Sequence, residues 1–199
     1  MMRTITFFVF LFSLVFAHAQ DKRVVIEKFE NNDLRWDEFF EKEYTGSVQD
    51  GFFVLQSKKE GTVLHSVTEL PLDTEQSFKI TFTFMLPKID DKFFFGIIFN
   101  YQDESNYSNF LVSEKRCKIG NIAGGKNSLS RQNPIVLKSG KNREVVIEME
   151  KKGDKLFFSV DNMEAAIITK KIISNTFGFQ VEDANILKVK EVTMEQYNK

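Results

Sequence analysis

The chain has 199 residues, 42% of them hydrophobic, so it is long enough to bury a sizeable core. Its 27 basic and 28 acidic residues nearly cancel and are scattered along the chain, which argues against a nucleic-acid partner. Cys117 is the only cysteine, so an intramolecular disulfide is excluded.

The N-terminus has the three parts of a secretory signal peptide. Arg3 gives a positive start, residues 5–16 are almost wholly apolar, and an Ala-His-Ala sequence ends at Ala19. The apolar run is too short to span a bilayer, which takes roughly 20 residues, so a membrane anchor is the less favoured alternative. We expect residues 1–19 to be cleaved, leaving a secreted domain over 20–199, periplasmic or extracellular and without a transmembrane segment.

Helical periodicity is scarce. The best candidate is residues 31–43, where Asn32 or Asp33 is a possible N-cap. An irregular extended segment is the preferred interpretation.

The next segment, "TVLHSVTEL", places Val63, His65 and Val67 on one face of a strand. After signal cleavage His65 is the only histidine, so a Ser-His-Asp or Cys-His site would have to use it. A multi-histidine zinc site is excluded. A lone histidine on an apolar face is more often packed or hydrogen-bonded in a core, and we interpret His65 in this way.

Two apolar strands follow. Residues 78–86 alternate between apolar and polar, which predicts a half-buried strand. Residues 93–101 are apolar on both faces, with Phe99 and Tyr101 predicted to share one of them, which indicates a covered strand. Gly96 in its middle is expected to leave room for a neighbouring side chain or a ligand.

The stretch "FNYQDESNYSNF" predicts a hairpin with a polar loop between two aromatic strands. Tyr101, Asp103, Asn106 and Tyr107 offer rings for stacking on sugar and polar groups for hydroxyls, so they are the candidate ligand-binding residues. The alternative is cross-strand aromatic pairing that only fixes the hairpin register. Both interpretations remain open.

Two shorter features precede the last strands. Cys117 is interpreted as a small buried hydrophobic residue, with an exposed thiol as the alternative. Residues 122–127, "IAGGKN", lack the spacing of a phosphate-binding loop and predict a flexible turn.

The C-terminal third also has strand periodicity. Residues 143–151 and 155–162 alternate and are joined by a short glycine-containing connection at 152–154, which predicts a hairpin. In 186–194 the apolar phase shifts by one residue, which indicates a bulge near Lys190.

About a dozen short strands predict an all-β fold, one antiparallel β-sandwich. The order and spacing of several segments resemble the concanavalin A-like lectin/glucanase superfamily in its laminin-G-like, secreted bacterial form. The matching segments are 28–36, 44–57, 77–84, 95–112, 142–162, 177–183 and 186–194. The resemblance implies a jelly roll of two curved sheets. It also implies binding of a glycan or an extracellular protein, and in some members polysaccharide hydrolysis.

Hydrolysis of the laminarinase type would need a Glu-x-Asp-x-Glu strand, which lines one cleft with its carboxylates. The nearest match has Glu148 and Glu150 on one face, followed by Lys152 and without the intervening Asp. These two glutamates are the only catalytic candidates, and a solvated strand face is the preferred interpretation.

The resemblance also leaves calcium possible, with Asp183 and Asp33 as candidate ligands and no other cofactor expected. Relatives commonly have an aromatic residue packed under the terminal strands where Trp36 stands, so core packing is preferred over a stacking platform.

Three function hypotheses follow. The leading one is a secreted, non-catalytic domain that recognises a glycan or a protein. The second is a glycan hydrolase with an atypical carboxylate pair. The third is a structural component of the cell envelope.

Overall fold

The structure is a computed structural model that describes residues 22–87, 91–138, 142–183 and 185–197. These ranges form fifteen strands and no helix. In chain order the strands are β1 (Lys22–Glu27), β2 (Phe39–Phe40), β3 (Tyr44–Gln49), β4 (Phe52–Ser57), β5 (Val63–Glu69), β6 (Ser77–Leu86), β7 (Phe95–Asp103), β8 (Asn106–Val112), β9 (Arg116–Ala123), β10 (Lys126–Pro134), β11 (Arg143–Lys152), β12 (Lys155–Val160), β13 (Met163–Thr169), β14 (Thr176–Glu182) and β15 (Ile186–Tyr197). The predicted signal peptide lies outside the described residues.

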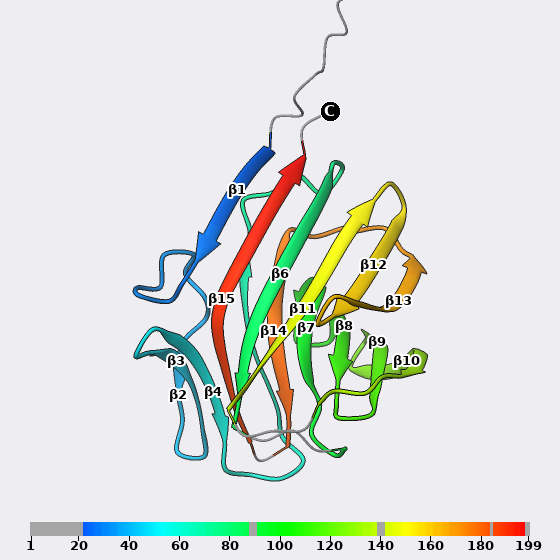
Figure 1. Cartoon of the computed structure of the whole chain (residues 1–199). Helices are drawn as coiled ribbons and strands as arrows, with labels where there is room; N and C mark the ends of the chain where they lie inside the picture. Colours follow the sequence, from blue (N-terminus) through cyan, green and yellow to red (C-terminus); the bar gives the residue numbers. More distant parts are fainter. Residues whose placement is uncertain (1–21, 88–90, 139–141, 184, 198–199) are drawn as a thin grey trace, which may run out of the picture.

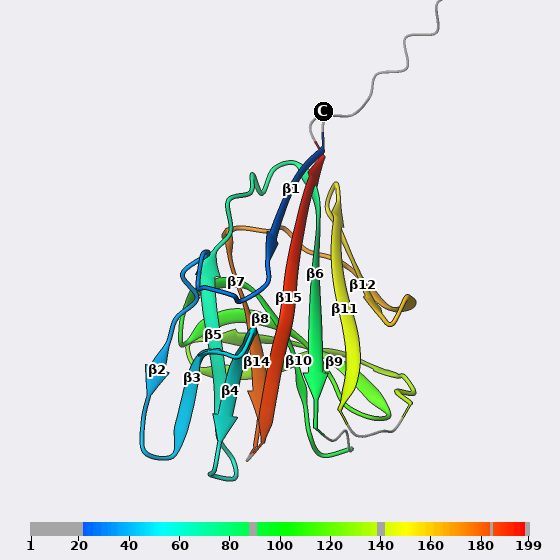
Figure 2. The ribbon, with the colours of Figure 1, turned by 60° about the vertical axis from the view of Figure 1, so that its left-hand side comes forward.

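Two antiparallel sheets stack face to face, the larger one in front of the smaller one in Figure 1, and Figure 2 gives a second view. Within the described ranges, the larger sheet has the order β13-β12-β11-β6-β15-β4-β3-β2, and β1 also pairs with β15. The smaller sheet has the order β10-β9-β8-β7-β14-β5. The predicted antiparallel β-sandwich is confirmed, and no described helix is long and apolar enough to cross a membrane.

The bulge predicted in the last strand is confirmed. Val189 pairs with Phe84, and the next pair is Glu191 with Thr83, so Lys190 is the extra residue. Before the bulge β15 pairs with β4, and after it β15 pairs with β1. The extra residue thus divides one long strand between two neighbours.

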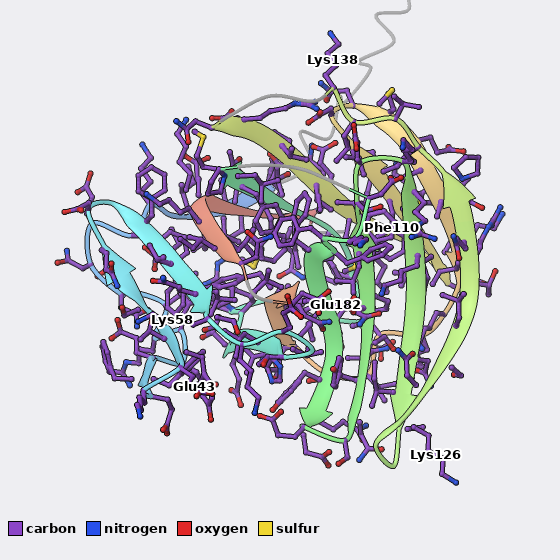
Figure 3. All side chains as sticks on the ribbon, turned by 90° about the horizontal axis from the view of Figure 1, so that it is seen from below. Glu43, Lys58, Phe110, Lys126, Lys138 and Glu182 are labelled. Carbon is purple, nitrogen blue, oxygen red and sulfur yellow. The ribbon has the colours of Figure 1, made fainter. Side chains whose placement is uncertain are left out.

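The core lies between the sheets and consists largely of phenylalanine. The alternation predicted for β6 and β11 is confirmed, because their apolar residues are buried and the polar ones between them are mostly half-buried. Phe110 lies in this interior (Figure 3). The largest fully buried side chains are Trp36, Phe29, Phe53, Phe78, Phe82, Phe84, Phe95, Phe99, Phe110, Phe158, Phe177 and Phe179.

The segment between β1 and β2 is irregular, as the preferred interpretation predicted. Asn32 accepts a hydrogen bond from the Trp36 amide at 2.7 Å and donates one to the Trp36 carbonyl at 2.8 Å. The buried Glu27 carboxylate accepts from the amides of Phe29 and Leu34. Side chains thus satisfy backbone groups that a helix would pair internally. They hold Trp36 in the core, which confirms core packing.

The structure also tests the expectations for Cys117, for Gly96 and for two glycine-containing turns. Cys117 is buried, as the preferred interpretation predicted. Gly96 makes room for neither a side chain nor a ligand, because a Cβ there would lie 2.2 Å from the backbone oxygen of Phe110. The glycine permits close approach of two strands. Turns are present at both predicted glycine-containing connections, where φ is 62° at Gly153 and 57° at Gly124.

Candidate functional site

The β7–β8 hairpin contains a bulge that the alternation of its sequence does not reveal. Its register breaks after the pair Phe99–Ser108 and resumes at Asp103–Asn106, so three residues of β7 stand opposite one residue of β8. Asn100, in this bulge, has a φ of 54°, a left-handed conformation that asparagine adopts more readily than most residues.

The Asn100 side chain fixes the bulge to the segment between β13 and β14. Its amide nitrogen donates to the carbonyl of Lys171 at 2.9 Å, and its oxygen accepts from the amide of Ile173 at 2.8 Å. The side chain is buried, so both bonds are shielded from water. The hairpin and the crossing segment are therefore held together.

The bulge moves Tyr101 to the other face of its strand. Phe99 belongs to the main core, whereas Tyr101 packs in a second cluster on the outer face of the smaller sheet. The sequence-based expectation that both rings share one face is wrong, because strict alternation fails where extra residues enter a strand. Tyr101 consequently lies at the surface beside Tyr107.

Three rings meet on this outer face. The centroids of His65 and Tyr101 are 5.7 Å apart, those of His65 and Tyr107 are 5.8 Å apart, and those of the two tyrosines are 6.0 Å apart. Such separations are typical of favourable ring contacts. Tyr107 is buried and Tyr101 half-buried, so Tyr101 presents the accessible ring. We call these three residues the ring cluster.

His65 lies in this cluster rather than in the core between the sheets. It does share the outer face with Val63 and Val67, as expected, and its side chain is 12% exposed. Its Nε2 is 3.2 Å from the carboxylate of Glu104, at the hairpin tip. Among the described residues, its buried Nδ1 has no hydrogen-bond partner.

Glu104 also contacts the accessible ring. Its other oxygen accepts a hydrogen bond from the Tyr101 hydroxyl at 3.3 Å. Burial, together with the negative charge of Glu104, raises the pKa of Tyr101 to about 12, and the same causes raise the pKa of Tyr107. Both phenols are therefore neutral hydrogen-bonding groups at physiological pH.

The side chains of Asp103 and Asn106 form hydrogen bonds that stabilise the turn. Asp103 accepts hydrogen bonds from the Ser105 amide at 2.7 Å and from the Asn106 side chain at 2.9 Å. The Asn106 oxygen accepts from the amide of Gly124 in the neighbouring hairpin. The four predicted ligand residues are thus brought together, with the polar pair already engaged in the turn. A ligand role for that pair stays a prediction.

Asp37 approaches the same face from the irregular segment before β2. Its amide donates to the carbonyl of Val67, and its carbonyl accepts from the Ser66 hydroxyl, so the segment docks on the free edge of β5. Burial raises the pKa of the Asp37 carboxyl, with the charge of Glu104 adding to it and His65 opposing it. The carboxyl group of Asp37 thus interacts electrostatically with His65 and Glu104.

Three adjacent clefts lie against His65 or Tyr101 of the ring cluster, and together we call them the β5 groove. A cleft of about 460 Å³ lies against His65 and Glu104 and shares Asp37 with one of about 480 Å³. The second shares Tyr101 and Gln102 with a third, of about 560 Å³, near the start of β14. Each volume is in the range of small-ligand sites, roughly 300–1,000 Å³.

The catalytic candidates lie elsewhere, on the outer face of the larger sheet. Glu148 accepts hydrogen bonds from Lys79 and Ser159, each at 2.9 Å. Burial would raise the pKa of Glu148, but these hydrogen bonds outweigh it and lower the pKa. Glu150 pairs with Lys152 at 2.7 Å. A glycosidase acid needs a raised pKa, so Glu148 has the opposite tuning.

The calcium candidates are not gathered into a ligand set. Asp183 accepts a hydrogen bond from the Gly61 amide at 3.0 Å, and Asp33 is exposed in the irregular segment. Over the described ranges, no group of three or more His, Cys, Asp or Glu side chains is placed to hold a metal ion.

Sequence reasoning missed two carboxylates, and it expected His65 in a core, whereas the residue packs in the ring cluster on the outer face of the smaller sheet. Glu104 stands between the two predicted tyrosines, and that position was the available signal for it. Asp37 has no such signal, because the segment that carries it docks on β5 only in the folded chain.

No family model and no curated protein matches the chain. Solved structures do match, at low identity. A Bacillus subtilis protein of unknown function with a galectin-like fold has a TM-score of 0.63 at 12% identity, covering 88% of this chain and 96% of its own. The carbohydrate-binding module CBM66 from Bacillus subtilis has a TM-score of 0.57 at 13% identity, covering 78% and 94%.

Another match is an enzyme. The catalytic domain of an endo-1,3-β-glucanase (laminarinase) from Thermotoga petrophila has a TM-score of 0.59 at 8% identity, covering 90% of this chain and 100% of its own. Similar structures thus include both carbohydrate-binding modules and glycan hydrolase domains, and at such identities the likeness concerns the fold. The chain has the concanavalin A-like jelly-roll fold.

Proposed function

We propose that this chain is a secreted, non-catalytic domain that binds a saccharide chain along the β5 groove. The observation that carries the proposal is the ring cluster, where a half-buried Tyr101 lines two adjacent clefts with Tyr107 and His65 packed against it. A sugar presents an apolar C–H face that stacks on such a ring. Its hydroxyl groups need charged and amide partners close by.

The groove supplies those polar partners at its walls. Asp37 and Glu104 offer carboxylate oxygens, and Gln102 and Thr176 offer neutral groups. Hydrogen bonds to a charged partner contribute more than neutral ones. Support for recognition also comes from the carbohydrate-binding modules that share the fold.

The test is a glycan array on the mature domain, followed by affinity measurements on the best saccharide. Tyr101→Ala should weaken binding about fivefold, because a stacking ring contributes on the order of 1 kcal/mol. The matched control is Tyr197→Ala on the larger sheet, whose hydroxyl also donates to a glutamate, Glu195, at 2.9 Å. Equal affinities for the two variants would contradict the proposed site.

One observation favours hydrolysis as a second candidate. The pKa of the Asp37 carboxyl is raised, as a general acid requires, and Glu104 lines the same cleft. Release of reducing ends from the array saccharide, abolished by Asp37→Asn, would replace recognition with catalysis. Co-purification with an envelope protein, without any glycan affinity, would instead support the structural hypothesis.

A further inference from the structure

A fourth cavity, of about 220 Å³, lies on the other side of the β7–β8 hairpin from His65. The segment that joins β13 to β14 forms one wall and carries Lys170 and Lys171. The strands β8 and β9 form another wall with Ser108 and Asn121. Asn100, which clamps the Lys171 carbonyl, fixes the position of the lysines. We call this space the lysine cavity.

The hydrogen-bond partner of Lys170 in this cavity is neutral. The Lys170 Nζ donates to the side-chain oxygen of Asn121 at 2.8 Å, and the same oxygen accepts from the Ser108 hydroxyl at 3.1 Å. Among the residues that the structure describes, no carboxylate pairs with Lys170, and none lines the cavity. Burial alone lowers the pKa of Lys170.

Two other half-buried lysines have a carboxylate partner, and the buried Lys151 donates instead to the backbone carbonyls of Glu75 and Gln76. Lys79 pairs with Glu148 at 2.9 Å, and Lys118 pairs with Glu182 at 2.8 Å. A partly desolvated ammonium group without a counter-charge costs free energy, so a charge left in that condition calls for an anionic partner. Binding of an anion would therefore offset the free-energy cost of burying the Lys170 ammonium group.

The second lysine adds to the positive charge. Lys171 lies 3.5 Å from Glu75, but both side chains are more than 70% exposed, so that pair is weak and easily exchanged. Four amide side chains also line the cavity, those of Asn100, Gln102, Asn106 and Asn121, although the amide nitrogens of Asn100 and Asn106 already donate to the Lys171 carbonyl and to Asp103. Ammonium and amide groups are the donors that bind oxyanions through charge-assisted hydrogen bonds.

We propose that the lysine cavity binds an oxyanion, the carboxylate or sulfate group of an acidic saccharide. The cavity is smaller than most whole-ligand sites, so it suits a substituent better than a sugar ring. It shares Gln102 with two clefts of the β5 groove and Ile173 with one. The inference that the groove takes an acidic glycan rests on the proposed function, whereas the anion site itself stands without it.

The site is tested first with inorganic sulfate. Sodium sulfate titrated against sodium chloride at equal ionic strength should produce saturable NMR shifts of the Asn121 side-chain amide. Lys170→Gln should abolish these shifts. Lys58→Gln makes the same charge change on the exposed loop after β4, on the opposite side of the view in Figure 3 from Lys126 at the β9–β10 turn, and should preserve them. Shifts that never saturate, or that are equal in both variants, would overturn the site.

The second test uses chondroitin sulfate oligosaccharides, their desulfated form and the desulfated, carboxyl-reduced form. The neutral form should bind about tenfold more weakly than the sulfated form, the loss expected for one charge-assisted hydrogen bond. Loss on desulfation identifies sulfate as the recognised group, and loss only on carboxyl reduction identifies the uronate. Lys170→Gln should reduce affinity for the charged forms to that of the neutral form. Equal affinity of wild type for all three forms would overturn the acidic-glycan inference.

The two proposals fail in different ways. If Tyr101→Ala weakens glycan binding but Lys170→Gln changes neither the sulfate shifts nor the affinities, the groove stands and the lysine cavity is refuted. If sulfate binds through Lys170 but Tyr101→Ala has no effect on any glycan, the cavity stands and the groove is refuted.

Discussion

The outer faces of the two sheets are built from different chemistry. On the larger sheet charges neutralise one another in pairs, such as Lys22 with Glu195 at 2.8 Å and Lys190 with Glu144 at 2.7 Å. The smaller sheet also has an ion pair, Lys118 with Glu182, but beside it lie three rings, several clefts and Lys170, for which the described residues provide no carboxylate partner. None of the four described clefts is lined by β6, β11, β12 or β15.

The outer face of the larger sheet therefore suits contact with water, whereas the outer face of the smaller sheet suits binding of a ligand. A face of short ion pairs presents satisfied charges to water, and each exposed pair contributes roughly 0–1 kcal/mol to folding. A face with an accessible ring and a lysine without a carboxylate partner retains groups that a ligand can satisfy. The position of the groove follows from the bulge at Asn100 and from the segment that docks along β5.

The largest expected effect tests the core that both faces share. Phe82 is fully buried, stacks on Phe84 and contacts Trp36 edge-on. Phe82→Ala should lower the free energy of unfolding by roughly 3–5 kcal/mol, through lost burial and the cavity left behind. Chemical denaturation measures this change in the free energy of unfolding. Phe40→Ala, at a ring that is 73% exposed, is the control and should change it by less than about 0.5 kcal/mol. Similar losses in both variants would contradict the burial pattern.

An intermediate effect is expected at the bulge that creates the smaller sheet's outer face. Asn100→Ala removes two partly buried hydrogen bonds and leaves an alanine at positive φ, a conformation that asparagine adopts more readily than alanine. It should cost about 2–3 kcal/mol of unfolding free energy. Asn100→Gly loses the same bonds but tolerates that φ, so it should be about 1 kcal/mol less destabilising. Equal stability of the two variants in urea denaturation would show that the left-handed conformation carries no cost.

The smallest effect is expected on the larger sheet. Glu148, whose side chain is 22% exposed, has a pKa below its ordinary value because of Lys79 and Ser159. A lowered folded-state pKa stabilises above the unfolded pKa of about 4.3, and that contribution is lost as the pH falls through the folded value. Glu148→Gln should therefore cost about 0.5–1 kcal/mol at pH 7, and less at pH 3.

Denaturation curves of wild type and Glu148→Gln at both pH values measure this difference. Glycan affinity should be the same in the two proteins, since Glu148 lies on the sheet opposite the groove. A loss of affinity at neutral pH with unchanged stability would move the site to the larger sheet.

Most of the fold was predictable from the sequence, because period-two alternation reports burial directly. The strands around Phe82 and Ile147, the hairpin at Gly153 and the bulge at Lys190 are all confirmed. The bulge at Lys190 was visible because apolar residues continue on both sides of it and change phase. At Asn100 the residues beyond the bulge form a loop, so no second phase exists to reveal it.

Within the site, the hairpin and its two tyrosines were predictable from the sequence, since residues that flank a tight turn must meet. The tertiary structure decided the rest. His65, Asp37 and Lys170 reach the hairpin from segments far away in sequence, through the pairing of β14 with β5 and β7 and through the Asn100 clamp. Local periodicity carries no information about such pairings, because the free energy that selects them comes from packing the two sheets together.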